Sequence, residues 1–206
     1  MTRGPGVVFF DLGGVVCRFH PERRLAALAA ATGLAEPDIH ARIWGSGLDD
    51  RMDRGDYTLE EAHRAVVNAL GRPIARDTLV SAWARASEPD ADVLVLVDAV
   101  RRDRRAAMLS DNGPLLLAAL PRHLPELAPR FDPLCFSSDL GAVKPTVTCF
   151  ARALARAGVD AADALLIDDV PANVEGARAH GLGAIHFTGA RELAQELARR
   201  GIEARR

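Results

Sequence analysis

The stretch Val7-Val8-Phe9-Phe10-Asp11-Leu12-Gly13-Gly14 decides the fold predicted for this 206-residue chain. Its first four residues are β-branched or aromatic, which is typical of a strand buried on both faces, as in a parallel sheet. The run ends at a carboxylate, Asp11, and the glycine pair after it indicates a turn. An acid at this place lies at the carboxyl edge of the sheet, where open α/β folds bind their ligands. An ordinary turn after a strand is the alternative, unless later segments supply partners for this acid.

The second half of the chain alternates strand patterns with helix patterns. Strands are expected at residues 106–110, 134–137, 164–167 and 183–187. Amphipathic helices are expected at residues 90–102, 146–157, 172–180 and 191–200. Alternation of this kind favours right-handed crossovers and a parallel sheet. The predicted fold class is therefore α/β, a Rossmann-like three-layer parallel sheet.

Residues 17–87 have a different pattern, which predicts helices and no convincing strand. We expect helices at residues 21–34, 36–44, 58–70 and 75–86, with a polar loop at residues 45–57. Thr58 and Glu61 match a capping box that opens the third of these helices. The predicted domains are a Rossmann-like core, residues 1–16 and 88–206, and an inserted all-helical cap, residues 17–87.

The composition argues against several classes of partner. The formal charge is 26 − 28 = −2, which gives no electrostatic reason to expect nucleic acid or an anionic membrane. The longest aliphatic stretch, Leu115 to Leu120, is far too short to span a membrane, and the first six residues carry no apolar signal region. Three distant cysteines, Cys17, Cys135 and Cys149, indicate reduced thiols and a cytoplasmic location. The six histidines show no zinc spacing.

Polar side chains follow four of the predicted strands at or just after their ends. They are Asp11, Ser110, Lys144 and the pair Asp168-Asp169. In a parallel sheet these strand ends lie along one edge, so the groups converge despite their distance in sequence. The three acids would repel one another without a cation between them, and hard oxygen ligands favour Mg²⁺. With Ser110 and Lys144 as anion-binding groups, the set suits phosphoryl transfer.

Four segments resemble, in order, the four motifs of the haloacid dehalogenase-like hydrolases. They are Phe10–Val15, Leu109–Asn112, Leu140–Pro145 and Ile167–Ala177. The resemblance covers roughly residues 7–187, with the helical insert between the first two motifs. It is greatest to the subgroup with a small helical cap, which includes sugar-phosphate phosphatases and the phosphatase domain of soluble epoxide hydrolase.

The resemblance implies a role for each matching residue. Asp11 resembles the nucleophile that forms an aspartyl-phosphate. Mg²⁺ would be held by Asp11, the backbone carbonyl of Gly13 and Asp169, with Asp168 in support. The phosphoryl group would be bound by Ser110, Asp111, Asn112 and Lys144, and Lys144 would also offset the charge of the nucleophile. Asn173 would orient Lys144 or its loop.

Gly13 departs from the family pattern. Most phosphatases of the family carry at this position a second aspartate that protonates the leaving group. General acid–base help of this kind is typically worth about 10²–10⁴ in rate. Its loss predicts a slow or leaving-group-selective phosphatase, acting on a sugar phosphate or another substrate with a good leaving group. His20 is one candidate for a substitute proton donor. Trp44, Asp49, Asp50 and Arg51 belong to a segment that either reaches over the site or forms a solvated loop.

The predicted function is Mg²⁺-dependent hydrolysis of a small phosphorylated metabolite through an aspartyl-phosphate. Two alternatives stay open. One is a metal-independent 2-haloacid dehalogenase, which also lacks the second aspartate but has no need of the pair Asp168-Asp169. The other is a catalytically silent regulatory member of the same fold, which Gly13 favours and which Asp11 and Lys144 oppose.

Overall fold

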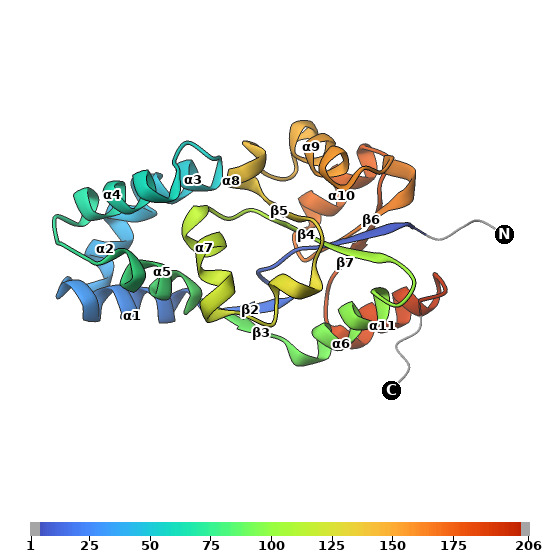
Figure 1. Ribbon diagram of the computed structural model, residues 1–206, viewed down its shortest axis with the longest axis horizontal. Helices are drawn as coiled ribbons and strands as arrows, with labels where there is room; N and C mark the ends of the chain where they lie inside the picture. Colours follow the sequence, from blue (N-terminus) through green and yellow to red (C-terminus); the bar gives the residue numbers. More distant parts are fainter. Residues whose placement is uncertain (1–4, 203–206) are drawn as a thin grey trace.

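The computed structural model describes residues 5–202, and its centre is a five-stranded parallel sheet (Figure 1). The strands lie in the order β5-β4-β1-β6-β7, so the first strand of the chain is the middle one. All residues of β1 are fully buried, because helices cover both faces of the sheet. The strands are β1 (Val7–Phe10), β4 (Arg105–Ser110), β5 (Leu134–Phe136), β6 (Ala164–Asp168) and β7 (Gly183–His186).

Helices pack on both faces of this sheet and give the fold three layers (Figure 1). Phe9 points into the apolar cluster on the face covered by α9 and α10, and Phe10 points into the cluster on the face covered by α6 and α11. This alternation follows from the two-residue period of a strand. The α/β, Rossmann-like fold class predicted from the sequence is confirmed. The helices are α6 (Ala91–Val100), α9 (Val147–Ala157), α10 (Pro171–Ala179) and α11 (Ala190–Ala198).

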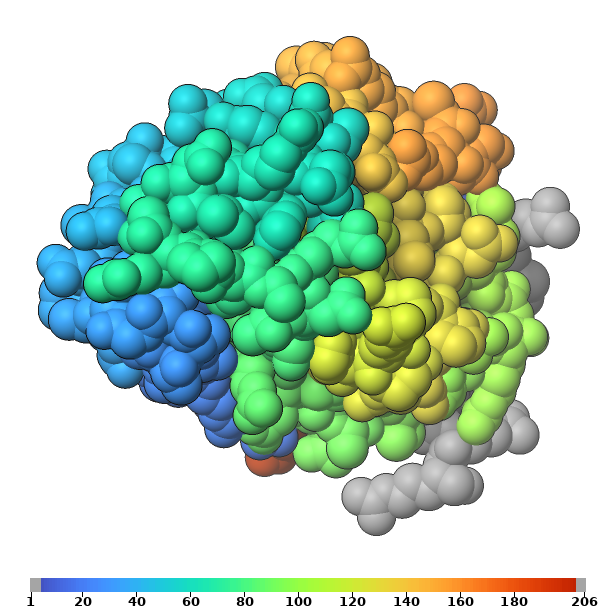
Figure 2. All heavy atoms as spheres, turned by 60° about the vertical axis from the view of Figure 1, so that its left-hand side comes forward, coloured from blue at the N-terminus to red at the C-terminus, as the bar shows by residue number. Residues whose placement is uncertain are grey.

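Five helices, α1 to α5, gather beyond the carboxyl ends of the strands and are called the cap below (Figure 1). They pack onto the rest of the molecule through α7 (Pro114–His123), which contacts both α4 and α5. Ile43 and Val66 of the cap belong to the same buried cluster as Phe10, so apolar contacts seat the cap on the sheet domain. Figure 2 shows this end of the molecule, with the cap and the core side by side. The cap helices are α1 (Pro21–Thr32), α2 (Glu36–Ile43), α3 (Leu48–Asp53), α4 (Leu59–Leu70) and α5 (Arg76–Ala84).

The polar loop predicted at residues 45–57 is wrong, because this segment contains the helix α3. Leu48 and Met52 lie four residues apart, on one side of α3, and both are buried. A helix of this length presents only two apolar positions, which is too few for a recognisable period. Its remaining positions are charged, and for that reason the segment resembles a loop in the sequence.

Two short strands frame the cap, where the sequence predicts none. β2 (Cys17–Phe19) and β3 (Ser87–Pro89) pair in antiparallel orientation. Strands of three residues are too short to show alternation in a sequence. Arg18 and Arg23 both form ion pairs with Glu88, at 3.4 and 2.5 Å, and link the beginning of the cap to its end. The division into core and cap stays a prediction, and this ribbon lies at the predicted boundary.

The remaining helical elements of the described chain are short. α8 (Ser137–Leu140) follows β5, and single 3₁₀ turns lie at Ala128–Arg130 and Ala161–Asp163. The three cysteines are free and buried. Within residues 5–202, no helix combines the length and the apolar character needed to traverse a bilayer. The predicted ends of the core, residues 1–4 and 203–206, lie outside the described residues.

Candidate active site

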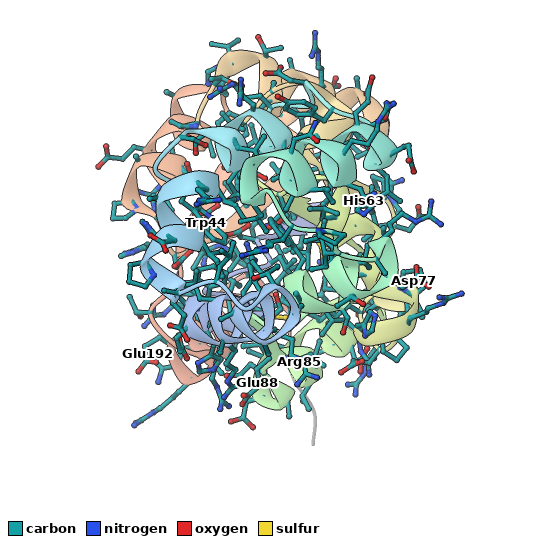
Figure 3. All side chains as sticks on the ribbon, turned by 90° about the vertical axis from the view of Figure 1, so that its left-hand side faces the viewer. Trp44, His63, Asp77, Arg85, Glu88 and Glu192 are labelled. Carbon is teal, nitrogen blue, oxygen red and sulfur yellow. The ribbon has the colours of Figure 1, made fainter. Side chains whose placement is uncertain are left out.

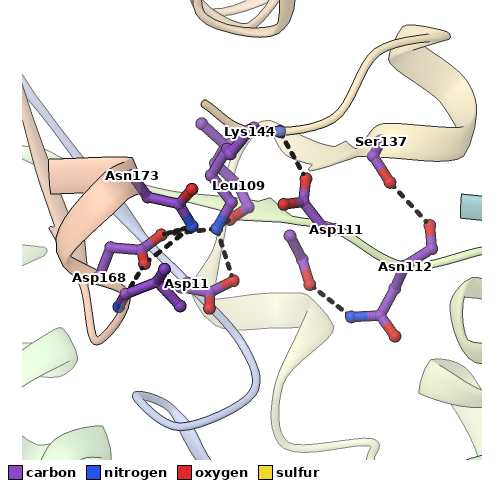
Figure 4. A network of polar contacts seen from close by, with 10 residues as sticks. Asp11, Leu109, Asp111, Asn112, Ser137, Lys144, Asp168 and Asn173 are labelled. Atoms are coloured by element: carbon purple, nitrogen blue, oxygen red, sulfur yellow. Dashed lines mark hydrogen bonds and ion pairs between the residues drawn. The ribbon is translucent and has the colours of Figure 1, made fainter. Parts of the chain in front are cut away.

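A buried lysine joins two of the predicted acids (Figure 4). The ammonium nitrogen of Lys144 lies 2.9 Å from Oδ1 of Asp11 and 2.6 Å from Oδ2 of Asp168. It also donates a hydrogen bond to the backbone carbonyl of Leu109 at 3.1 Å. The Lys144 side chain is 1% exposed, and that of Asp168 is 0% exposed. Among the described residues, Lys144 is the one cation that forms an ion pair with Asp11 and Asp168, so the charge balance of this buried group depends on one residue.

Neighbouring strands place the two acids side by side. Asp11 directly follows β1, and its backbone N–H donates to the carbonyl of Ile167 in β6 at 2.9 Å. Asp168 is the last residue of β6. Since β1 and β6 are parallel and paired, their ends meet at the same edge of the sheet. The convergence predicted from the strand ends is therefore present for Asp11 and Asp168.

Asn173, expected to orient Lys144 or its loop, contacts Asp168. Its side-chain amide donates to both carboxylate oxygens of Asp168, at 3.0 and 3.2 Å. The backbone N–H of Val170 adds a third hydrogen bond, 2.9 Å from Oδ1. Asn173 lies in the first turn of α10, which begins at Pro171, so the start of this helix is built around the carboxylate. Any effect of Asn173 on Lys144 passes through Asp168.

The three acids among the predicted metal ligands lie together, with one oxygen left unpaired. Asp11, Asp168 and Asp169 each offer an oxygen atom, and these atoms lie within 4.8 Å of one another. Oδ1 of Asp169 is buried without a hydrogen-bond partner, which is costly unless another group compensates it. A Cβ on Gly14 would lie 2.2 Å from Oδ2 of Asp169, so only glycine allows this approach. Three hard oxygen ligands, one of them orphaned, fit a cation such as Mg²⁺.

Burial and pairing oppose each other in the ionisation of this group. Burial raises the pKa of Asp11 to about 6, although the Lys144 ammonium acts to lower it. Burial also raises the pKa of Asp169. Burial alone would lower the pKa of Lys144, but the carboxylates of Asp11 and Asp168 raise it above its ordinary value. Near pH 7 the lysine is therefore charged and Asp11 is mostly ionised, as a nucleophile requires.

The predicted phosphate-binding loop faces the site only in part. Ser110 is fully buried, and its hydroxyl accepts a hydrogen bond from the amide of Asn112 at 2.8 Å. Asp111 and Asn112 line the cavity described next, whereas Ser110 does not. Oδ1 of Asp111 accepts a hydrogen bond from the backbone N–H of Lys144 at 3.0 Å, which ties this loop to the lysine. The phosphate-binding role of Ser110 stays a prediction.

A cavity of about 330 Å³ separates these groups from the cap. Its volume falls within the range of small-molecule sites. Gly13 lies in its wall, and a Cβ there would meet only a ring carbon of Phe19 at 4.0 Å, so the space above this glycine is open. On the core side the cavity is lined by Asp11, Gly13, Asp111, Asn112, Lys144, Asp169 and Asn173. From residues 19–87 it is lined by Phe19, Arg24, Trp44, Asp49, Asp53 and Ser87.

A sequence model of the haloacid dehalogenase-like hydrolases matches residues 5–181 of the chain. The chain belongs to this family. The match includes all four motif segments and the helical insert, so the family resemblance seen in the sequence is confirmed. The likeness to the subgroup with a small helical cap stays a prediction.

Solved structures share the fold of this haloacid dehalogenase-like hydrolase. A haloacid dehalogenase-like hydrolase of Porphyromonas gingivalis is 26% identical, with a TM-score of 0.79 over 96% of this chain and 99% of that one. A family enzyme of Bacteroides thetaiotaomicron, in complex with magnesium and inorganic phosphate, is 17% identical, with a TM-score of 0.69 over 88% and 93%. The L-2-haloacid dehalogenase of Xanthobacter autotrophicus, with chloropropionic acid covalently bound, is 21% identical, with a TM-score of 0.62 over 96% and 84%. The last two show a shared fold only.

The cap wall of this haloacid dehalogenase-like hydrolase contains Arg24, which the sequence analysis missed. Arg24 is 4% exposed, and its guanidinium lies 5.6, 5.8 and 5.0 Å from the ring centres of Phe19, Trp44 and Trp83. Its Nε is buried without a hydrogen-bond partner. The sequence does contain a signal for the burial of Arg24, because it lies four residues before Leu28, on the apolar side of α1. A charge in an apolar stripe is a candidate for a functional role.

Of the other candidates from the sequence analysis, some line the cavity and some lie outside it. Trp44 and Asp49 line the cavity, and the indole N–H of Trp44 donates to Asp49 at 2.7 Å. Figure 3 shows Trp44 in the cap, which faces the viewer there. Asp50 and Arg51 are exposed and are not part of the cavity wall. His20 also lies outside the wall, with its ring nitrogens 3.2 Å from a carboxylate oxygen of Glu22 and 3.6 Å from one of Glu88.

Proposed function

We propose that this chain is a Mg²⁺-dependent phosphatase that hydrolyses a small phosphate ester through an aspartyl-phosphate on Asp11. The observation that carries the proposal is the unpaired, buried oxygen of Asp169 beside Asp11 and Asp168. Lys144 offsets part of the charge of Asp11 and Asp168 but makes no ion pair with Asp169 among residues 5–202. A divalent cation held by these acids would supply the missing positive charge.

In this proposal, each residue of the site has its own role in the reaction. Asp11 attacks phosphorus through a carboxylate oxygen, while Lys144 keeps this carboxylate ionised and oriented. When bound, Mg²⁺ would neutralise charge on the phosphoryl oxygens. Asp168 holds Lys144 in place and is itself held by Asn173. The backbone N–H of Asp111 donates to the phosphoryl group, and the cap excludes bulk water.

The cap side of the cavity supports a polar leaving group of small size. Arg24, Asp49 and Asp53 face the cavity together with the rings of Phe19 and Trp44. Hydroxyl groups can donate to carboxylates and accept from a guanidinium, and aromatic faces cover the apolar side of a ring. A sugar phosphate meets this chemistry, as does another small phosphorylated metabolite with a good leaving group. We place the enzyme in the cytoplasm, where its three cysteines would stay reduced.

The test is a panel of sugar phosphates, nucleotides and acyl phosphates, assayed with Mg²⁺. We expect turnover that EDTA abolishes and that excess Mg²⁺ restores. Asp11→Asn keeps the shape of the side chain but removes the nucleophile, so it should abolish turnover. Activity that survives either treatment contradicts the proposal.

A dehalogenase is the second candidate, because Gly13 and the shared fold with a haloacid dehalogenase favour it. Chloride release from 2-chloropropionate in the presence of EDTA would decide for it. A catalytically silent member is the third candidate. Tight binding of beryllofluoride together with Mg²⁺, abolished by Asp11→Asn, would support the enzyme, and absence of any metal binding would support the silent protein.

A further inference from the structure

Among the described residues on the core side of the cavity, Lys144 is held in its ion pairs and Asp11 and Asp169 belong to the carboxylate cluster, so none of them is free to protonate a leaving group. The position that normally carries the acid is Gly13, and the space above it is open to within 4.0 Å of Phe19. His20 lies outside the cavity wall, beside Glu22 and Glu88. Asp111 is engaged by the backbone N–H of Lys144. A donor must therefore come from the cap, if there is one.

Asp53 is the cap carboxyl that lies free in the cavity wall. It is the last residue of α3 and lines the same cavity as Asp11. Its Oδ1 lies 3.3 Å from the position that a Cβ on Gly113 would occupy, so it rests against the loop that begins at Asp111. Within residues 5–202, no hydrogen bond or ion pair engages its side chain, whereas Asp49 beside it accepts from Trp44.

The surroundings of Asp53 keep its carboxyl protonated near pH 7. Burial is the largest cause, and the charges of Asp49, Asp111 and Asp50 add to it, against the lowering effect of Arg24; together they raise the pKa of Asp53 to about 8. The elements packed against α3 are α2, α4 and α8, and several of their ionisable groups are engaged elsewhere. These are Arg42 with the carbonyl of Leu70, Glu60 with Arg76, Glu61 with Thr58, His63 with the carbonyl of Ile74, and Asp139 with Arg156.

We propose that Asp53 donates to the leaving-group oxygen the proton that Gly13 cannot supply, an inference that rests on the proposed phosphatase function. As Asp11 attacks, the bond from phosphorus to the ester oxygen breaks, and its electron pair stays on that oxygen. The oxygen takes the proton of the Asp53 carboxyl, which leaves a free alcohol, an aspartyl-phosphate and an Asp53 carboxylate. A buried carboxyl with a raised pKa is suited to this role.

The same residue can serve the second step. Water attacks phosphorus from the side that the alcohol has left, opposite Asp11, so it occupies the place next to Asp53. The Asp53 carboxylate takes one proton from this water, the bond from phosphorus to Asp11 breaks, and inorganic phosphate and the protonated Asp53 result. This role weakens the preference for good leaving groups that Gly13 alone predicts.

The experiment compares benzyl phosphate with 4-nitrophenyl phosphate, which are similar in shape but differ strongly in the basicity of the leaving group. Asp53→Asn should lower kcat/KM for benzyl phosphate by about 10²–10³ and for 4-nitrophenyl phosphate by less than about tenfold. The exposed Asp38→Asn of α2, whose charge is not among those that act on Asp53, is the matched control and should change neither. Gly13→Asp in the Asp53→Asn background should restore turnover of benzyl phosphate, because the open space at Gly13 admits the side chain.

Equal losses on both substrates, or no loss on either, overturn the role of Asp53. If Asp53→Asn does not fold, the wild-type enzyme decides the question. A preference for 4-nitrophenyl over benzyl phosphate by more than about 10⁴ would mean that no proton donor acts. If wild-type turnover survives Asp11→Asn, the proposed function itself is wrong. If Asp11→Asn abolishes turnover while Asp53→Asn acts equally on both substrates, only the assignment of Asp53 is wrong.

Discussion

The Nζ of Lys144 lies 2.6 Å from a carboxylate oxygen of Asp168, in a place that solvent does not reach. The same nitrogen lies 2.9 Å from Oδ1 of Asp11, so one ammonium group offsets part of the negative charge of two carboxylates. Pairs of this kind gain little over apolar packing when complete, but removal of one partner leaves a buried charge without compensation. The lysine is therefore required for the fold of the site as well as for its chemistry.

Lys144→Met should destabilise the protein by about 3–5 kcal/mol, because it leaves Asp11 and Asp168 facing each other unpaired. Urea unfolding in the absence of metal measures this change in the free energy of unfolding. The control is Arg122→Met, which removes an ion pair with Asp77 whose side chains are both 78% exposed. That change should stay within about 1 kcal/mol. Equal stability of the two variants would contradict the importance assigned to the buried pair.

Gly14→Ala should weaken Mg²⁺ binding at least about tenfold, because the new Cβ would displace the Asp169 carboxylate that it meets at 2.2 Å. The matched control is Gly33→Ala, whose backbone has a similar positive φ, 71° against 82°, but whose Cβ would meet nothing within 4 Å. Both variants suffer the same kind of backbone strain, of about 1–2 kcal/mol. Isothermal titration with Mg²⁺ separates them, and equal affinities would argue against Asp169 as a ligand.

The sheet and the acids at its edge could be predicted because their signals are local. A run such as Val7–Phe10 identifies a buried strand without knowledge of its neighbours, and Asp11 and Asp168 follow two such runs directly. The convergence of these acids then follows from the geometry of parallel sheets alone. The contact of Asn173 with Asp168 could not be predicted, since the direction of its amide depends on how α10 begins, and its role in orienting Lys144 or the loop stays a prediction.

The cap side of the site could not be predicted in the same way. Arg24 and Asp53 line the same cavity because α1 and α3 both pack against α2, and because α4 and α5 pack against α7. The contacts with α7 join residues that are distant in sequence. α3 itself has two apolar positions and four charged ones, so no period revealed it. For Ser110, the sequence predicted its place at the end of a strand. It did not predict that the side chain is buried and hydrogen-bonded to the amide of Asn112.

Asn173→Ala should reduce Mg²⁺ affinity or turnover by about 10–100-fold, because it removes both hydrogen bonds that the Asn173 amide donates to the Asp168 carboxylate. The expected signature is a lowered kcat together with weaker Mg²⁺ binding, whereas the KM for the phosphate ester should change less. Asn68→Ala, at an exposed position of α4, removes the same amide from the surface and should change none of these values. Identical kinetics of the two variants would mean that Lys144 and the backbone N–H of Val170 suffice to orient Asp168.

The carboxyl of Asp53 makes stability depend on pH in a direction that can be derived. Burial and the neighbouring carboxylates raise its pKa from 3.8, the value of a free aspartate side chain, to about 8 in the folded protein. Between these values the unfolded chain binds fewer protons at this residue than the folded chain, so stability falls as the pH rises. Asp53→Asn removes this loss, and its free energy of unfolding relative to wild type should increase between pH 5 and pH 9 by at least about 1 kcal/mol. Urea unfolding at both pH values, without metal, measures the difference, and the exposed Asp38→Asn, whose charge does not act on Asp53, should show almost none. A difference independent of pH would mean that Asp53 ionises normally, and a normally ionised carboxylate could not act as the acid near pH 7.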